Sequence, residues 1–96
     1  MAAADQLMLQ HHADRQQFVF DTHVGRAHVD YRIDAGLLSV LSTFVPPALR
    51  GKGIAAQLTE AVLEYCRREQ LALRPVCSYT VSYLKQHPQP DLSIRS

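Results

Sequence analysis

The stretch that decides the fold reads TFVPPALRGKGIAAQL and runs from Thr43 to Leu58. An apolar run ends at two prolines, two glycines follow on either side of a lysine, and a helical pattern then begins. Proline has no N–H to give to a sheet, so Pro46 and Pro47 predict the end of a strand. Glycine tolerates a left-handed backbone, so Gly51 and Gly53 predict a tight loop into the helix.

The predicted helix has a single apolar stripe, as an amphipathic helix packed on a sheet should. The side chains of the stripe recur at helical spacing: Ile54, Leu58, Ala61, Val62, Tyr65 and Cys66. Thr59 and the charged residues of the segment fall off the stripe. Cys66 is interpreted as a core residue.

The chain before this stretch has the two-residue period of β-strands. It predicts strands over residues 7–10, 15–21, 26–33 and 37–45, the first of them a weak edge strand. Turns at Gly25 and Gly36 connect the later ones, so the strands should form a four-strand antiparallel meander. The last strand is apolar on both faces, and we expect it to be covered on both sides.

The chain after the helix supplies one more strand and a short helix. Residues 71–77 (LALRPVC) are too short for a helix and predict a strand. Ser78 is a capping residue for a helix that should end at His87 and Pro88. The tail from Gln89 has little pattern and is predicted to be loose.

This order of elements predicts an α/β (α+β) fold, in which the meander is followed by a βαβ crossover and a short C-terminal helix. The crossover makes residues 71–77 run parallel to residues 37–45. Pro75 cannot donate to the ladder, so the two parallel strands should part near it and leave a slot beside the helix start. We expect one domain over 1–96, with a core of about 6–88.

Composition limits the classes of partner. The chain has 96 residues, 47% hydrophobic and 20% charged, and a formal charge of +1. That charge gives no basic field for nucleic acid, and no apolar run is long enough for a membrane span. Two cysteines and no recognisable signal peptide favour a reducing, cytoplasmic protein. Such a small core suits a monomer or a weak homodimer.

The glycine loop has the parts of an anion site. The N–H groups of Arg50 through Ala55 should face the start of the helix, where the dipole adds a partial positive charge. Arg50 and Lys52 add full charges, which favours phosphate or pyrophosphate. Alternatively, Gly51 and Gly53 only form a turn. A P-loop is excluded because Gly53, not Ser or Thr, follows the lysine, and a dinucleotide-binding motif is excluded because its third glycine is absent.

Arg50 to Ala55 also satisfies R/Q-x-x-G-x-G/A, the coenzyme A signature of the Gcn5-related N-acetyltransferases. With VPPALRGKGIAAQL, VDYRIDAG and PVCSYTVSYLKQHP, the chain resembles the small single-domain branch of that family, the N-acetyltransferase domain-containing or YjdJ-like proteins. The resemblance covers Gln6 to Pro88. It implies acetyl-CoA (coenzyme A) as co-substrate, with the pyrophosphate on the glycine loop and the pantetheine arm in the slot. The implied cofactor-binding residues are Phe44, Val45, Arg50, Gly51, Lys52, Gly53, Ile54 and Ala55.

Cys77 and Tyr79 are the catalytic candidates. Cys77 comes at the reactive end of the slot and before a helix start, where a thiolate is favoured. It either carries the acetyl group or only lines the site; an unplaced cysteine is more often a buried small residue. Tyr79 is either the general acid for the departing thiolate or a packing residue, and Tyr83 is interpreted as packing.

The catalytic base of similar proteins could be a histidine that this chain lacks. Similar proteins carry a histidine shortly before Thr-x-Val-Pro, where this chain has Ser42. The five histidines are predicted to be surface residues: His11, His12, His23, His28 and His87. Their spacing indicates no metal site.

The sequence therefore predicts an acetyl-CoA-dependent N-acetyltransferase acting on an amine. The first two strands are joined by few residues, which leaves the acceptor side open enough for a protein side chain or N-terminus. The alternative is a non-catalytic coenzyme A or acyl-CoA binding module, which the missing histidine supports. A third possibility is a structural domain whose glycine turn binds nothing.

Overall fold

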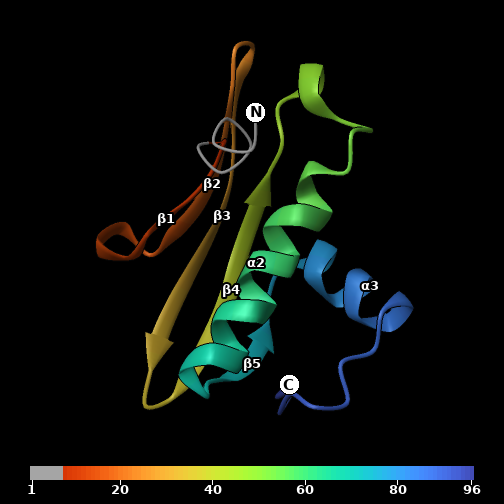
Figure 1. Cartoon of the computed structure of the whole chain (residues 1–96). Coiled ribbons are helices and arrows are strands. Elements are labelled where there is room, and N and C mark those ends of the chain that lie inside the picture. The colour runs from red at the N-terminus through yellow and green to blue at the C-terminus, as the bar shows by residue number, and fades with distance from the viewer. Residues whose placement is uncertain (1–7) are drawn as a thin grey trace.

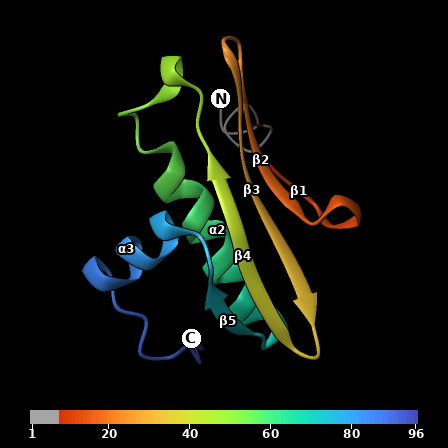
Figure 2. The ribbon, with the colours of Figure 1, turned by 180° about the vertical axis from the view of Figure 1, so that it is seen from behind.

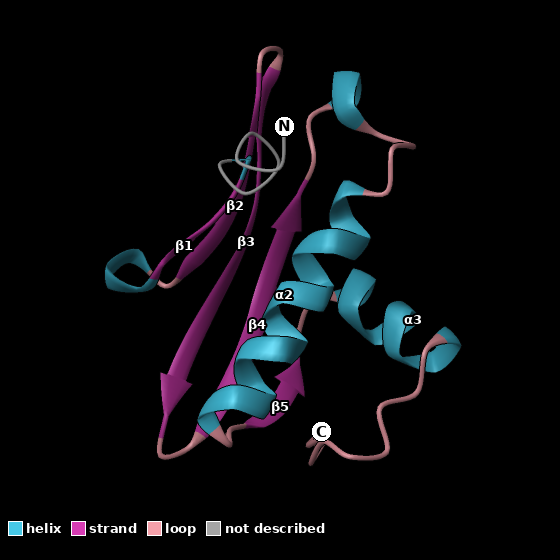
Figure 3. Ribbon diagram, in the orientation of Figure 1, coloured by secondary structure: helices cyan, strands magenta, loops and turns pink. Residues whose placement is uncertain are grey.

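The computed structural model describes residues 8–96, so Leu7 of the predicted first strand lies outside the described residues. Five strands form one sheet in the order β1-β2-β3-β4-β5, and the main helix crosses one face of it (Figures 1 and 3). The elements are β1 (Leu9–His12), the 3-10 turn η1 (Ala13–Arg15), β2 (Gln17–Thr22), β3 (Gly25–Asp34), β4 (Leu37–Phe44), the 3-10 turn η2 (Pro47–Leu49), α2 (Ile54–Glu69), β5 (Ala72–Pro75) and α3 (Ser78–Gln86).

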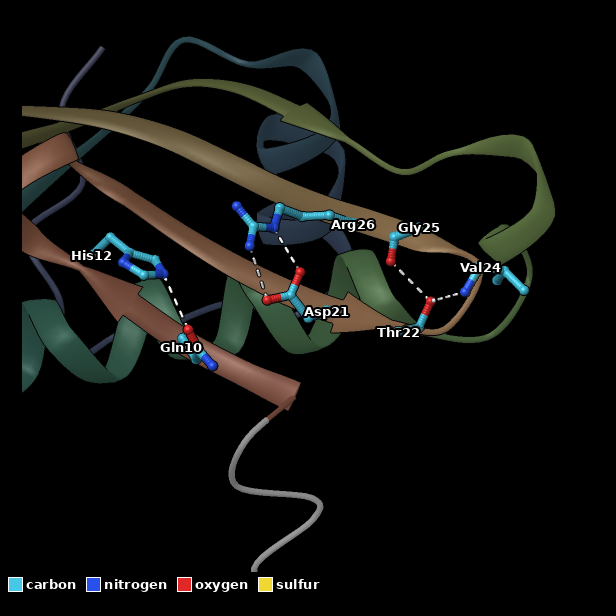
Figure 4. Close-up of polar contacts among 7 residues, drawn as sticks. All are labelled: Gln10, His12, Asp21, Thr22, Val24, Gly25 and Arg26. Atoms are coloured by element: carbon cyan, nitrogen blue, oxygen red, sulfur yellow. Dashed lines mark hydrogen bonds and ion pairs between the residues drawn. The ribbon is translucent and has the colours of Figure 1, made fainter.

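The predicted antiparallel meander is confirmed. β1, β2 and β3 each pair antiparallel with the strand that follows. In the β2–β3 hairpin, Thr22 Oγ1 donates to the carbonyl oxygen of Gly25 and accepts from the N–H of Val24 (Figure 4). Gly36 has φ +77° in the β3–β4 turn, a conformation that glycine adopts without strain.

The core lies between α2 and the face of the sheet that it covers, called here the inner face. On β3, Ala27, Val29 and Tyr31 are buried on this face, as the alternation predicted. The predicted helix stripe is confirmed by the burial of Ile54, Leu58, Val62 and Cys66. These apolar groups form one hydrophobic cluster that fixes the helix to the sheet.

Two positions correct the helix prediction. Thr59 is buried although it falls off the predicted stripe, and Leu63 is buried as well. Thr59 satisfies its hydroxyl by donating to the carbonyl oxygen of Ala55 at 2.9 Å, so its burial leaves no polar group unpaired. The buried face of α2 is wider than the stripe because α3 lies beside it (Figure 1).

A β-bulge changes which residues of β4 face inward. Tyr31 pairs with Val40 but its neighbour Asp30 pairs with Ser42, so Leu41 is the extra residue. Because cross-strand partners share a face, Val40 and then Thr43 point to the inner face. Without the bulge, the inner position would fall on Ser42.

The prediction that β4 is covered on both sides is only half right. Its first half is buried at Leu38 and Val40, whereas Leu41 and Phe44 are 40% and 47% exposed. The reason is that Leu38 and Val40 lie on the inner face, which α2 covers, whereas Phe44 lies opposite His28 on the outer face. β5 pairs with β4 only from Leu37 to Val40. The second half is an open edge.

The parallel pairing of β4 and β5, and its parting at the proline, are both confirmed. The register ends where Val40 faces Pro75. The carbonyl oxygen of Val40 then accepts from two successive N–H groups, those of Val76 at 3.0 Å and Cys77 at 2.9 Å. The chain turns away from β4 at this point and enters α3.

The prediction of a loose tail is wrong. The free edge of β5 is covered, because Leu73 donates its N–H to the carbonyl oxygen of Ser93 and accepts from the N–H of Arg95. Arg67 on α2 also pairs with Asp91, its Nε lying 2.6 Å from a carboxylate oxygen. The tail therefore satisfies backbone groups that an exposed edge strand would leave open.

Helix α3 does not begin as predicted. Its N-cap position is Cys77, with no side-chain cap, and Ser78 is the first helical residue. The helix is instead attached to α2 through Tyr83, which is 8% exposed and donates its hydroxyl to Glu60. The prediction that Tyr83 packs is confirmed.

The prediction of surface histidines is wrong for His11. Its ring stacks on Phe18 with centroids 4.0 Å apart, bonds to the hydroxyl of Tyr31 and meets the edge of Tyr65. Burial lowers the pKa of His11, with a smaller effect from Arg68, and it raises the pKa of Tyr31 to about 12. This cluster joins β1 to α2.

No helix within residues 8–96 has the length and apolar character needed to cross a bilayer.

Removing residues 91–96 should destabilise the fold by exposing the edge of β5. Two backbone hydrogen bonds at Leu73 are lost, which together contribute about 1–2 kcal/mol. Urea denaturation should show a lower midpoint, whereas Arg95→Ala, which keeps the backbone bonds, should lie close to wild type. An unchanged midpoint for the truncated chain would show that the tail contributes nothing.

Candidate functional site

A groove lies where β4 leaves β5, between the start of α2 and the start of α3. It consists of two adjoining hollows of about 240 and 280 Å³ that share Val45, Arg50, Ala55 and Tyr79. Thr43 and Phe44 line one of them, and Gly51, Gly53 and Ile54 line the other. Seven of the eight predicted cofactor-binding residues therefore surround one groove; Lys52 is exposed and lies outside its lining.

The backbone at the α2 end of the groove has free donors. No described residue accepts from the N–H groups of residues 51–56, and the first helical bond runs from Gln57 to Gly53. Gly51 and Gly53 have φ +80° and +77°, and a Cβ built on either would meet nothing within 4 Å. The glycines thus turn the chain and leave open space in front of the amides, as an anion requires.

Arg50 corrects the predicted set of donors. Its own N–H is used by the carbonyl oxygen of Pro47 at 3.3 Å, in η2, so the free amides begin at Gly51. Its side chain folds back, and Nε donates to the carbonyl oxygen of Val45 at 3.0 Å. The guanidinium thereby places positive charge along the groove between β4 and the glycine loop.

Cys77 stands at the parting of the strands, and its Sγ lies 3.5 Å from Thr43 Oγ1. Partial burial disfavours the thiolate, but hydrogen bonds from the Thr43 hydroxyl and from the N–H groups of Thr80 and Tyr79 outweigh it and lower the pKa of Cys77. Cys66 is fully buried, which raises the pKa of its thiol to about 11. Of the two free thiols, Cys77 is therefore the one that ionises more readily.

Thr80 is another neighbour of the Cys77 thiol. It is 1% exposed, and its hydroxyl makes no regular hydrogen bond with any described residue. The hydroxyl is turned toward Cys77 and contributes to the lowered pKa of the thiol. Sulfur is a weak acceptor as a thiol and a good one as a thiolate, so the buried hydroxyl gains a partner when Cys77 ionises.

Tyr79 lines both hollows of the groove, and its ring lies 6.2 Å from that of Tyr83. Burial, and then the nearby Cys77, raise the pKa of Tyr79, so its hydroxyl keeps its proton at neutral pH. A protonated phenol at the reactive end of the groove is suited to act as a proton donor.

Two parts of this site were not predicted from the sequence. Thr43 reaches Cys77 only because the bulge at Leu41 turns it to the inner face. Thr80 was missed because a threonine inside a short helix gives no sign of its burial. The signal that could have found Thr43 is the apolar run itself, whose alternation is broken at Ser42 and Thr43.

No group of three or more metal-binding side chains lies within the part of the chain that the structure describes.

Comparison with known proteins shows the family of the chain. A sequence model of the GCN5-related N-acetyl-transferase family matches residues 17–92. The chain belongs to this family. The match includes both the glycine loop and Cys77.

Relatives and a solved structure extend the comparison. The chain is 31% identical to Protein NATD1 of Mus musculus over 84 residues, 81% of this chain and 76% of the relative. Protein NATD1 of Gallus gallus is 31% identical over 88 residues, 88% of this chain and 80% of the relative. The NMR structure of a GCN5-like protein from Staphylococcus aureus has the same fold, with a TM-score of 0.72, 22% identity, and coverage of 92% of this chain and 87% of that one.

The two thiols should differ in their alkylation by iodoacetamide, followed by mass spectrometry against pH. Cys77 should react faster, with a midpoint below that of an ordinary thiol, because three neighbours stabilise its thiolate. Thr43→Val removes one of those hydrogen bonds and should move the midpoint up. Equal rates for Cys66 and Cys77, or no response to Thr43→Val, would contradict this account.

Proposed function

We propose that the protein is an acetyl-CoA-dependent N-acetyltransferase that moves an acetyl group to an amine. Its family generally uses acetyl-CoA. The observation that carries the proposal is the groove, which has free amides at one end and, at the other, Thr43, whose hydroxyl lies 3.5 Å from the thiol of Cys77. A reducing, cytoplasmic setting suits a site that contains a free thiol.

The pyrophosphate, the pantetheine arm and the thioester of acetyl-CoA each have a counterpart at this groove. The pyrophosphate would accept from the amides of Gly51 to Ala55, with Arg50 and Lys52 adding positive charge. The pantetheine arm would pair with the open edge of β4 at Phe44 and Val45, where β5 no longer supplies partners. The thioester then lies beside Leu41 and Cys77, where the strands part.

Two residues would act on the thioester. Cys77 can attack its carbonyl carbon as a thiolate and carry the acetyl group, or it can stay a neighbour while the amine attacks directly. In either route the departing sulfur of coenzyme A needs a proton, which Tyr79 is placed to give. Burial raises the pKa of Tyr79, so its hydroxyl is protonated at neutral pH but is a weaker acid than an ordinary tyrosine.

One observation favours the alternative, a coenzyme A binding module without chemistry. Ser42 donates its hydroxyl to Asp30 at 2.9 Å, and a serine held in this way cannot serve as a base. Mass spectrometry after incubation with acetyl-CoA separates the cases. An acetyl group on Cys77 would indicate the covalent route, and loss of most turnover in Cys77→Ala would support it.

Coenzyme A should raise the melting temperature of the wild-type chain, because a ligand of the native state stabilises it by mass action. Gly53→Ala should abolish that rise, since the new Cβ points into the space in front of the amides. The matched control is Gly36→Ala, which has the same φ of +77° and an equally open Cβ position, but lies at the other end of β4.

Both alanine variants should therefore suffer a similar loss of stability from backbone strain, about 1 kcal/mol. They should differ only in the response to coenzyme A. If millimolar coenzyme A does not raise the melting temperature of the wild type, the proposed function is contradicted.

A further inference from the structure

The outer face of the sheet carries a polar cluster beside the open edge of β4. Gln17, Asp30 and Ser42 lie side by side on β2, β3 and β4. The carboxylate of Asp30 accepts from Gln17 Nε2 at 2.7 Å and from Ser42 Oγ at 2.9 Å. Figure 2 shows this face of β3 and β4, with α2 beyond the sheet. Asp30 is thus fixed in place as a half-buried acceptor.

His28 is the next outward residue on β3, and Asp30 orients it. Its Nδ1 is buried, makes no regular hydrogen bond with a described residue, and lies 3.4 Å from Asp30 Oδ1. Its ring rests against Phe44, with centroids 5.6 Å apart. A carboxylate facing Nδ1 selects the tautomer in which Nδ1 carries the proton, and this leaves Nε2 free to accept one.

Several other ionisable groups on this face pair elsewhere, whereas Arg32 is exposed on β3 on the far side of Asp30 from His28. Arg26 on β3 pairs with Asp21 on β2, its Nε 2.6 Å from a carboxylate oxygen, and His12 on β1 bonds to Gln10 (Figure 4). Among the residues described, Asp30 is therefore the carboxylate that faces the His28 ring.

The cluster lies within reach of the groove through the edge of β4. Ser42 and Thr43 are consecutive residues that point to opposite faces: Ser42 to Asp30, and Thr43 to Cys77. Because β5 ends at Pro75, no strand closes the space between these faces beyond Val40. A polar hollow of about 480 Å³ borders Asp30 on the side away from His28, with Leu41 and Arg32 also in its lining, and gives room for the molecule that carries the amine.

We propose that the acceptor amine approaches over the outer face beside Leu41, and that His28, oriented by Asp30, takes its proton. This inference rests on the proposed function. The acceptor class is a primary amine that reaches the site as an ammonium ion, attracted by the Asp30 carboxylate.

His28 Nε2 takes one proton from the ammonium group and passes it to solvent. The freed lone pair attacks the acetyl carbonyl carbon, a C–N bond forms, and the C–S bond breaks with its electron pair leaving on sulfur. Tyr79 gives its proton to the departing sulfur and is reprotonated by the second proton of the nitrogen, and the amide keeps the third.

His28→Gln tests the assignment, with acetyl-CoA and two probe amines, n-butylamine and triglycine, at concentrations high enough to drive binding. Turnover at pH 7 should fall about 100-fold or more, as expected when a general base is lost. The difference in turnover between wild type and His28→Gln should narrow as pH rises, because more of the amine is then already neutral. The matched control is His23→Gln, an exposed histidine in the β2–β3 turn, which should behave as wild type.

Two further measurements keep the result unambiguous. The rise in melting temperature with coenzyme A should be the same in His28→Gln as in wild type, which shows that the variant folds and binds. Asp30→Asn, which weakens the orientation of the ring, should lose less turnover than His28→Gln and show the same narrowing with pH.

The outcomes separate the two proposals. If the wild type gives no melting response to coenzyme A, the proposed function fails whatever His28 does. If coenzyme A binds and the wild type transfers acetyl, but His28→Gln keeps full turnover with an unchanged pH profile, the assignment of His28 is overturned. If coenzyme A binds but neither amine is acetylated, the assignment of His28 is also overturned, and the groove is then only a binding site for coenzyme A.

Discussion

The carbonyl oxygen of Val40 is the last acceptor that β4 offers to its parallel neighbour. It takes the N–H groups of both Val76 and Cys77, after which the two strands separate. Pro75, which has no N–H, stands opposite it, so the ladder has no means of continuing in register. Everything that gives this chain a site follows from that parting. It leaves the edge of β4 open, sends Cys77 to the start of α3, and creates a groove that ends at the glycine loop.

The bulge at Leu41 adds a second constraint to the same strand. One inserted residue turns Thr43 toward the thiol and Ser42 toward Asp30, so consecutive side chains serve opposite faces of the sheet. If β4 were regular, Ser42 would point at the groove, and neither the thiol nor the carboxylate would have its present hydroxyl partner. The bulge therefore links the cofactor groove to the polar cluster around His28, and our two proposals depend on one local irregularity.

The meander, the amphipathic helix and the glycine loop could be predicted because each has a local signal. Gly51 and Gly53 need a positive φ, and the stripe from Ile54 to Cys66 has a clear period. The bulge has a weaker signal, the polar pair Ser42 and Thr43 that interrupts the apolar run, and this pair does not show which residue of β4 is the extra one.

The tail and Thr80 were misjudged or missed for a related reason. Ser93 and Arg95 stabilise β5 through backbone atoms, which any sequence can supply, so the pattern predicted a loose tail where the structure has hydrogen bonds. The burial of Thr80 depends on how α3 sits against the sheet. The polar contacts of the site thus come from tertiary structure rather than from sequence motifs.

The central claim is that a coenzyme occupies the groove with its pyrophosphate on the glycine loop. Amide chemical shifts followed by NMR during titration with coenzyme A, and separately with pantetheine, test it most directly. Coenzyme A should move the amides of Gly51, Gly53 and Ile54 together with those of Phe44 and Val45. Pantetheine, which has no pyrophosphate, should move only the β4 amides. If coenzyme A left the chemical shifts of the glycine amides unchanged while it shifted residues elsewhere, the loop would only be a turn that binds no pyrophosphate, and the account would be wrong.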